Sequence, residues 1–433
     1  MNDRLRQLEQ LFRGFLRAND FHLNTDGWGN PLGGTTTGRY VVLRANCGHD
    51  NQRLVDALIP ATLYQLIPWD TGALKPQVYL DRQRVAVEAP LPKDEQQAAV
   101  KLSELTESQH GGRVVVLGPN EYGTTISLPL VDMIHVLIGG ETGSGKTYTM
   151  RSFACQLANG RNRIVLIDGK HGDGLGILNG VPGQVGPLAV EPDTIRNALG
   201  WVHSEMLARY AVVMNDRNGH AWASNEGPEH ILVFFDEVQV YRDDKAVMGL
   251  LHDLAAMGRS ARVHLVAGTQ KPTVRMFGPD VGGATRDQFG TRIAHAVATY
   301  QASNAIIGAP EPRADYLQPQ GDAYVLANIG NYPLRERVQI AYVPEDEITF
   351  DGTPELDRWP EYEFEDTGAG RPRIRFSDEQ IAASIIAAQQ GLGRGKLQDI
   401  LTELEQGISG AEPAMRLLEM GRNIKNAMDD LSV

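Results

Sequence analysis

Gly140-Glu-Thr-Gly-Ser-Gly145-Lys146-Thr147 stands between an apolar run at residues 134–138 and a helical pattern at residues 148–158. The eight residues match the phosphate-loop pattern G-x-x-x-x-G-K-[ST], in the strand-before, helix-after context that the pattern requires. Glycines let such a loop curl so that successive N–H groups point at phosphate oxygens, and the helix N-terminus adds positive potential. The stretch therefore predicts a phosphate-binding loop and, around it, an α/β fold.

The chemistry expected at this loop is that of ATP with Mg²⁺. Lys146 is expected to reach the β- and γ-phosphates, and the Thr147 hydroxyl to bind Mg²⁺. The predicted nucleotide-binding residues are Gly140, Glu141, Thr142, Gly143, Ser144, Gly145, Lys146, Thr147 and Tyr148.

A second chemical signal is Ile231-Leu-Val-Phe-Phe-Asp236-Glu237. An apolar strand ends here in two adjacent carboxylates, at the sheet edge where open α/β folds bind ligands. Asp236 is expected to hold Mg²⁺ and Glu237 to polarise the attacking water. The alternative is an acidic pair that only ends a strand at the surface.

Polar residues also follow two other apolar runs. Gln270 follows the run at 263–269, where it is expected to contact the γ-phosphate unless it is a plain loop amide. Asp168 and Lys170 follow the run at 164–167. They either tie the nucleotide site to substrate-facing loops or form a structural ion pair.

An arginine supplied by another subunit often completes a phosphoryl-transfer site and is worth on the order of 10³–10⁵ in rate. Arg209, Arg259 and Arg292 are the candidates. Each is also compatible with an ordinary surface or paired arginine, so the residues alone do not assign the role.

The fold predicted from residue 111 onward is a mostly parallel sheet flanked by helices, because several apolar runs are continuous rather than alternating. The predicted strands are 114–117, 134–138, 164–167, 231–235, 263–267 and 291–297. Upstream, we expect a small α/β domain with a strand at 39–43, helix at 51–67, and a hairpin of 78–80 with 85–88.

The chain of 433 residues is long enough for two or three domains. The predicted parts are an N-terminal helix at 1–27, the small domain at 28–110, an α/β nucleotide-binding domain at 111–343, an acidic linker at 344–373, and a helical region at 374–433. That last region is predicted to be a helix-turn-helix or an αα-hairpin that docks on the preceding domain, and any other partner of this region is unknown.

Composition limits the function classes. The chain is 42% hydrophobic and 22% charged, with a formal net charge of −13. This excludes a uniformly basic nucleic-acid coat but leaves a local basic surface open. Two distant cysteines, Cys47 and Cys155, suggest no disulfide framework, and no apolar run reaches membrane-spanning length. We therefore expect a cytoplasmic protein.

Several motifs together resemble the FtsK/SpoIIIE family of DNA translocases. Residues 133–147 are similar to the family's strand and phosphate loop. Residues 167–170 resemble its "IDPK" segment with Gly169 in place of proline, and 259–272 are close to "RAAGIHLVLATQRP". Residues 198–210 look like its "W…EMERRY" helix, and 291–294 are similar to "TRIAF". The resemblance covers roughly residues 30–340, including the smaller domain upstream.

The resemblance implies a RecA-like ring, usually a hexamer, with double-stranded DNA in its channel and ATP between subunits. On matched positions, Arg209 or Arg259 would be the arginine that acts in trans. Loops after Asp168 and Gln270 would face the channel, and Lys170, Lys271 and Arg275 would contact DNA phosphates.

We therefore expect an ATPase that translocates double-stranded DNA as a ring-shaped homo-oligomer. The family's cell-division members carry membrane spans and a long linker, so a plasmid, phage or conjugative element is the expected setting. Two alternatives remain: a related ring ATPase that moves protein in a secretion system, and a DNA-binding recruitment protein with a weak nucleotide site.

Overall fold

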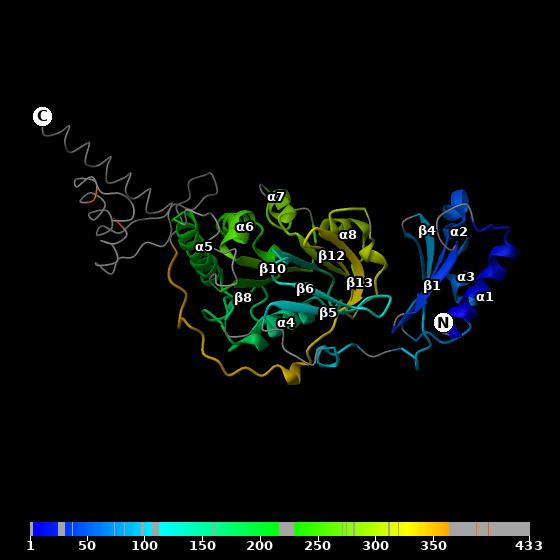
Figure 1. Cartoon of the computed structure of the whole chain (residues 1–433), viewed down its shortest axis with the longest axis horizontal. Coiled ribbons are helices and arrows are strands. Elements are labelled where there is room, and N and C mark those ends of the chain that lie inside the picture. The colour runs from blue at the N-terminus through cyan, green and yellow to red at the C-terminus, as the bar shows by residue number, and fades with distance from the viewer. Residues whose placement is uncertain are drawn as a thin grey trace, which may run out of the picture.

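The computed structural model places a small domain and a larger one along a single axis (Figure 1). It describes residues 3–24, 31–36, 38–72, 74–81, 83–96, 99–105, 112–158, 161–215, 229–270, 272–273, 275–279, 282–310, 312–318 and 320–362, together with Ala387 and Leu397. The predicted helical region at 374–433 lies outside these residues, apart from the last two.

The small domain is a four-stranded antiparallel sheet with helices on one face. The strand order is β1-β2-β4-β3. The strands are β1 (Leu32–Thr36), β2 (Tyr40–Ala45), β3 (Gln77–Asp81) and β4 (Arg84–Pro90), and the helices are α1 (Asp3–Ala18), α2 (Asn51–Ala57) and α3 (Pro60–Leu66).

Helix α1 forms part of this small domain's core. Its residues Leu5, Leu8, Phe12 and Leu16 are buried, as helical spacing of apolar residues requires, whereas Leu11 is exposed. The hairpin of β3 and β4 turns between Asp81 and Arg84, where the sequence predicts it. The predicted helix over 51–67 is two helices, because Pro60 starts a new one.

The large domain is built on a seven-stranded sheet in the order β13-β12-β11-β7-β10-β9-β8. The strands β11, β7, β10, β9 and β8 run parallel, and β12 and β13 are antiparallel. Their bounds are β7 (Val136–Gly139), β8 (Arg163–Asp168), β9 (Ile231–Asp236), β10 (Val263–Thr269), β11 (Thr291–His295), β12 (Asp322–Ile329) and β13 (Tyr332–Gln339).

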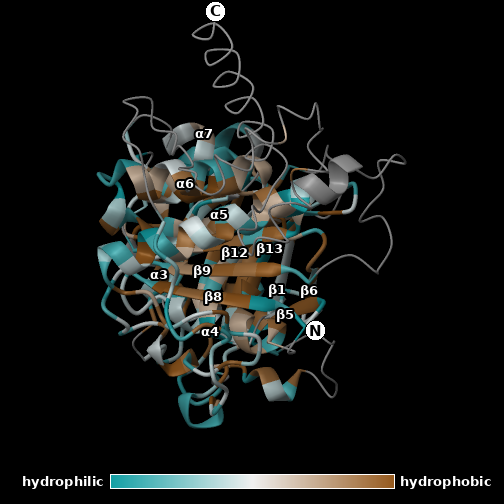
Figure 2. Cartoon of the chain, turned by 90° about the vertical axis from the view of Figure 1, so that its left-hand side faces the viewer, coloured by the Kyte–Doolittle hydropathy of each residue, from teal (hydrophilic) through white to brown (hydrophobic). Residues whose placement is uncertain are grey.

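Helices cover both faces of this sheet. Helices α5, α6 and α8 pack on one face, and α4 with a two-stranded hairpin packs on the other (Figure 1). The helices are α4 (Lys146–Leu157), α5 (Pro192–Asn215), α6 (Lys245–Met257), α7 (Gly282–Asp287) and α8 (Tyr300–Ile307). The strands form an apolar layer between the helices (Figure 2). The predicted α/β class with a mostly parallel sheet is therefore confirmed.

Two parts of the large domain differ from the predicted strands. Residues 114–117 lie not in the main sheet but in the hairpin of β5 (Val114–Pro119) with β6 (Thr125–Pro129). The antiparallel strands β12 and β13 were not predicted at all, because polar residues interrupt their apolar pattern: only half of the β12 positions are buried, and most of β13 is not.

The segment predicted as an acidic linker packs on the large domain up to Tyr362. The Trp359 ring covers Gly186 and is 5% exposed, and Tyr362 lies against Gly200. The backbone N–H of Leu356 donates to the Val185 carbonyl. Glycine at 186 and 200 leaves the room that these rings occupy, since a Cβ at either position would approach the ring within 2.7 Å.

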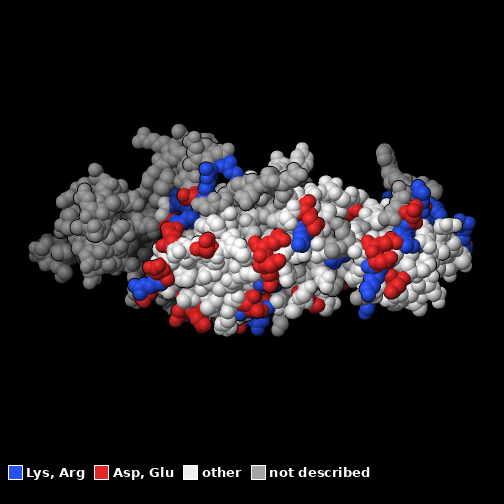
Figure 3. Space-filling view, turned by 90° about the horizontal axis from the view of Figure 1, so that it is seen from below, with Lys and Arg blue, Asp and Glu red and all other residues white. Residues whose placement is uncertain are grey.

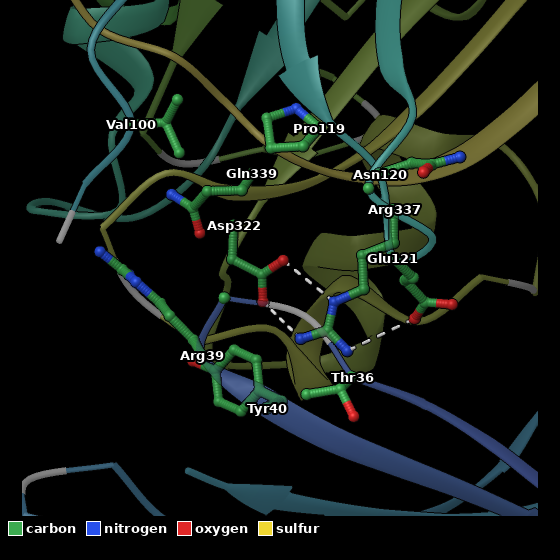
Figure 4. A pocket seen from close by; sticks show the side chains of 12 residues that line it. Thr36, Arg39, Tyr40, Val100, Pro119, Asn120, Glu121, Asp322, Arg337 and Gln339 are labelled. Carbon is green, nitrogen blue, oxygen red and sulfur yellow. Dashed lines mark hydrogen bonds and ion pairs between the residues drawn. The ribbon is translucent and has the colours of Figure 1, made fainter. Parts of the chain in front are cut away.

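A buried charge cluster joins the two domains. Arg337 of β13 donates to both Glu88 oxygens of β4, at 2.9 and 2.6 Å, and to both Asp322 oxygens of β12, at 3.0 and 2.5 Å. Figure 4 shows Arg337 directed at Asp322, beside a cavity of about 120 Å³. Burial alone would lower the pKa of Arg337, but the charges of Asp322 and Glu88 outweigh it and raise the pKa.

We predict that Arg337→Met destabilises the protein by about 3–5 kcal/mol, because two buried carboxylates lose their cation. Chemical denaturation at neutral pH measures the loss. The matched control is Arg335→Met on the same strand, where the side chain is exposed, and it should change the free energy of unfolding by less than about 0.5 kcal/mol. Equal effects of the two substitutions would contradict the role of the cluster.

Burial lowers the pKa of His264 to about 4. The unfolded chain then binds a proton below pH 6.5 that the folded chain does not, so the free energy of unfolding is highest above pH 6.5 and falls as the pH drops toward 4. We expect His264→Gln to reduce this slope by up to about 1.4 kcal/mol per pH unit. Denaturation curves at pH 7.5, 6.5 and 5.5 test this, with the exposed His22→Gln as control.

Candidate nucleotide-binding site

The loop at 140–147 connects β7 to α4 and is held between two neighbouring strands. The N–H of Gly140 donates to the carbonyl of Thr269, the last residue of β10, and the N–H of Glu141 donates to the Ala296 carbonyl after β11. Gly145 has a φ of +114°, and a Cβ there would lie 2.9 Å from the backbone nitrogen of Gly321. Glycine is therefore required at this position for both its dihedral angle and its contact.

Lys146 and Asp236 form an ion pair at the carboxyl edge of the sheet. Both side chains are 2% exposed, so each charge depends on the other for compensation. Lys146 is the first residue of α4, and Asp236 is the last residue of β9. Strand β10 lies between β9 and β7, the strand that leads into the loop. A phosphate that entered the loop would offer this ammonium a second anionic partner.

Thr147 and Asp236 both lie close to Gly174. A Cβ built on Gly174 would lie 2.6 Å from Asp236 Oδ2 and 3.5 Å from the Thr147 methyl carbon, Cγ2. A hydroxyl and a carboxylate are oxygen donors of the kind that Mg²⁺ prefers, with phosphate and water completing its octahedron. The residues therefore fit the predicted ion.

Glu237 follows directly, in a left-handed backbone conformation with φ of 60°. Its Oε1 accepts from the backbone N–H of Gln270 at 2.9 Å and from Gln239 Nε2 at 2.6 Å. The side chain is 2% exposed. The αL conformation is uncommon for glutamate and turns its carboxylate back toward the loop after β10.

The remaining predicted nucleotide-site residues lie close by. The amide oxygen of Gln270 accepts from the Thr142 hydroxyl at 3.2 Å, so Gln270 does lie beside the phosphate loop. Asp168 plays a structural part, because its carboxylate accepts from the backbone N–H groups of Lys170, Gly174 and Leu175 at 2.7 to 2.9 Å. It thereby fixes the loop that follows β8.

A cavity of about 430 Å³ opens beside the loop, and its far side was not predicted. Tyr148, Ile340 and Tyr342 give it an apolar wall, with the Tyr148 and Tyr342 rings edge to face at 6.0 Å. Gln320 and Gly321 line it from the segment before β12. Gln320, Gly321, Ile340 and Tyr342 flank the hairpin of β12 and β13, which the sequence pattern did not reveal, so only Tyr148 of this wall was predicted.

The hairpin also touches the loop backbone. The N–H of Gly321 donates to the Ser144 carbonyl at 2.8 Å. Below the loop, Nε2 of His295 lies 2.8 Å from the Thr149 hydroxyl, and burial lowers the pKa of His295 to about 4, so the ring is neutral at physiological pH. Its position at the end of β11, a strand already predicted to reach this edge, was the signal that could have identified it.

The three arginine candidates differ in exposure. Arg209 is buried on α5 and donates to the Ala261 carbonyl, and burial lowers its pKa to about 10. Arg292 is half-buried and donates to the carbonyls of Phe289 and Ile307. Arg259 is exposed in η5 (Gly258–Ala261), at the amino end of β10. Only Arg259 thus presents its side chain at the surface.

The predicted DNA-contacting residues lie apart. Lys170 is 34% exposed in the loop after β8, where it pairs with Glu237. Arg275 is exposed after β10, and Lys271 lies outside the described residues. On the face seen in Figure 3, acidic and basic side chains alternate in small patches rather than forming a continuous basic surface.

The fold and this constellation define a class: an α/β, RecA-like domain with a phosphate loop at the carboxyl edge of its sheet. The sequence model of the FtsK/SpoIIIE family matches residues 98–248. DNA translocase FtsK of Brucella melitensis biotype 1 is 26% identical, over 76% of this chain and 48% of its own. DNA translocase FtsK of Caldanaerobacter subterraneus is also 26% identical, over 77% of this chain and 52% of its own.

The chain is similar to the FtsK/SpoIIIE family in sequence, in agreement with the resemblance that its motifs indicate. It spans about half the length of the curated relatives that it matches. No described helix is both long enough and apolar enough to cross a membrane.

Solved structures share the fold. The pCW3 conjugation coupling protein TcpA, in its monomer form with ATPgS, has a TM-score of 0.50 at 19% identity, covering 80% of this chain and 96% of that one. The cytoplasmic domain of the Type VII secretion ATPase EccC of Thermomonospora curvata also has a TM-score of 0.50 at 19% identity, over 62% of this chain and 36% of that one.

We predict that Lys146→Met strongly weakens nucleotide binding, because the loop loses the buried ammonium at the start of α4. Titration with a fluorescent ATP analogue should show at least a 100-fold weaker affinity, about 2.7 kcal/mol. Lys245→Met, at an exposed first turn of α6, is the matched control and should bind normally. If the Lys146 variant kept its affinity for the ATP analogue, the loop would not be the nucleotide-binding site.

Proposed function

We propose that the protein hydrolyses ATP with Mg²⁺ and uses the energy to translocate double-stranded DNA as a ring-shaped homo-oligomer. The observation that carries the proposal is the convergence of Lys146, Asp236, Glu237 and Gln270 at one sheet edge, next to a 430 Å³ cavity. The names of the relatives supply the DNA substrate.

Each residue has a distinct part in the proposed hydrolysis. Lys146 neutralises the β- and γ-phosphates, and Thr147 with Asp236 would hold Mg²⁺, which supplies further charge neutralisation when bound. Glu237 orients the attacking water and accepts its proton. Gln270, whose backbone N–H holds the Glu237 carboxylate while its side chain meets Thr142, reports the presence of the γ-phosphate.

DNA contacts are proposed on the loops that leave the same sheet edge. Lys170 follows β8, while Lys271 and Arg275 follow β10, so hydrolysis and DNA would be coupled over a short distance. Lysine and arginine would contact phosphates rather than bases, giving binding that is independent of sequence and sensitive to salt.

A hexamer with a trans-acting arginine completes the proposal. Between the two arginines predicted from the family, exposure favours Arg259, because a buried guanidinium such as that of Arg209 is not available to a neighbouring subunit. We place the protein in the cytoplasm and in the DNA transfer or maintenance of a mobile element. The same fold occurs in a conjugation coupling protein.

The deciding experiment measures ATP turnover with and without linear duplex DNA at several salt concentrations. Stimulation that decreases as salt rises is expected. Turnover that DNA does not change at any salt concentration would contradict DNA translocation and favour a motor for protein substrates.

We predict that Glu237→Gln binds ATP normally but hydrolyses it about 10²–10⁴-fold more slowly, because the proton acceptor is lost while the phosphate contacts remain. Single-turnover kinetics and nucleotide binding separate the two effects. Asp243→Asn, an exposed carboxylate shortly after Glu237 in sequence, should leave turnover unchanged. Normal turnover in the Glu237 variant would exclude it from the mechanism.

A further inference from the structure

The two oxygens of the Glu237 carboxylate differ in their partners, because Oε1 accepts hydrogen bonds whereas Oε2 makes only an ion pair. Oε1 is held by the Gln270 N–H and by Gln239, while Oε2 lies 2.9 Å from the Lys170 ammonium. The first two partners lie on the adjacent turn and on the end of β10, within the buried edge of the sheet. Lys170 is different, because it approaches from the loop after β8 and is itself partly exposed.

The burial of the two partners is unequal. The Glu237 side chain is 2% exposed and that of Lys170 is 34% exposed. The lysine therefore reaches from solvent into the site, with its ammonium on the carboxylate and part of its side chain outside. An anion in the surrounding solvent can reach this cation without entering the nucleotide pocket.

The side chain of Lys170 can move while its backbone is held in place. Its backbone N–H donates to Asp168 Oδ1 at 2.7 Å, and the preceding Gly169 N–H donates to the Asp236 carbonyl at 3.0 Å. The backbone is thus fixed to β8 and β9. Lysine has a flexible four-carbon stem, so the ammonium can leave Glu237 without any change of the loop.

The ion pair opposes the role proposed for Glu237. A carboxylate that orients water and accepts a proton needs a free oxygen directed at the water. The Lys170 ammonium lies 2.9 Å from Oε2 and so stands where that water would have to bind. Moving the ammonium away leaves Oε2 open to the water.

We propose that Lys170 is a positioning residue that restrains Glu237, and that a backbone phosphate of duplex DNA releases the restraint by taking over the ammonium. This inference rests on the proposed function and gives it a regulatory step. Phosphate is the matching chemistry, because a lysine ammonium binds phosphate oxygens as a point charge, whatever the base sequence. DNA binding would then raise ATP turnover directly, through one side chain.

The test compares ATP turnover of the wild type, Lys170→Gln and Lys170→Arg, each without DNA and with saturating duplex DNA. In Lys170→Gln the DNA-free rate should rise at least fivefold, and the ratio of DNA-saturated to DNA-free rates should fall below two. Lys170→Arg keeps a cation and should restore most of the restraint. Lys245→Gln is the control for loss of an exposed lysine.

Melting temperature and ATP affinity of each variant establish that the fold and the nucleotide site are intact. Lys170→Met serves as a second neutral variant if Lys170→Gln is unstable. The double variant Lys170→Gln with Glu237→Gln should lose the elevated DNA-free rate, because the gain acts through Glu237.

Other outcomes overturn the inference. An unchanged DNA-free rate and an unchanged DNA ratio in Lys170→Gln would show that the ion pair does not restrain Glu237. Slower turnover both with and without DNA would assign Lys170 to the γ-phosphate of ATP instead. In both cases stimulation of the wild type by DNA leaves the proposed function standing. A wild type that DNA does not stimulate removes the proposed function, and with it DNA as the ligand of Lys170.

Discussion

The buried charges at the carboxyl edge of the large sheet are the constraint on which the rest of the structure depends. Lys146, Asp168, Asp236 and Glu237 are all nearly inaccessible, and a buried charge without a partner costs several kcal/mol. Each is compensated by an ammonium, a carboxylate or backbone N–H groups. The parallel strands supply this arrangement, because their carboxyl ends bring residues distant in sequence to one line.

The sequence was sufficient for the parts of this edge that are local in the chain. The phosphate loop and the Asp236-Glu237 pair each carry their chemistry within a few residues of an apolar strand, so pattern alone locates them. Strands β12 and β13 were not predicted, because both are only partly buried and their mixture of polar and apolar residues is also typical of loops. The cluster of Glu88, Arg337 and Asp322 was also missed, because it joins residues up to 249 positions apart. No local pattern encodes such a contact.

The small domain is connected to the phosphate loop by a short series of contacts. Glu88 on β4 binds Arg337, which binds Asp322, and the neighbouring Gly321 donates to the Ser144 carbonyl. Arg39 of the small domain reaches the same segment through the Gln320 carbonyl at 3.1 Å. A movement of one domain against the other would therefore be transmitted to the backbone of the phosphate loop.

Both outer strands of the large sheet are covered, at least in part, by other segments of the chain. Residues 184–189 lie beside β8. The backbone N–H of Leu356, in the segment that continues to Trp359, donates to the Val185 carbonyl. Beside β13 lies β5, joined through Leu117 and Asn120. In the proposed ring, copies of the large domain would therefore meet through side chains of helices and loops rather than by extending this β-sheet from subunit to subunit. Contacts of that kind can loosen and reform without breaking a backbone ladder.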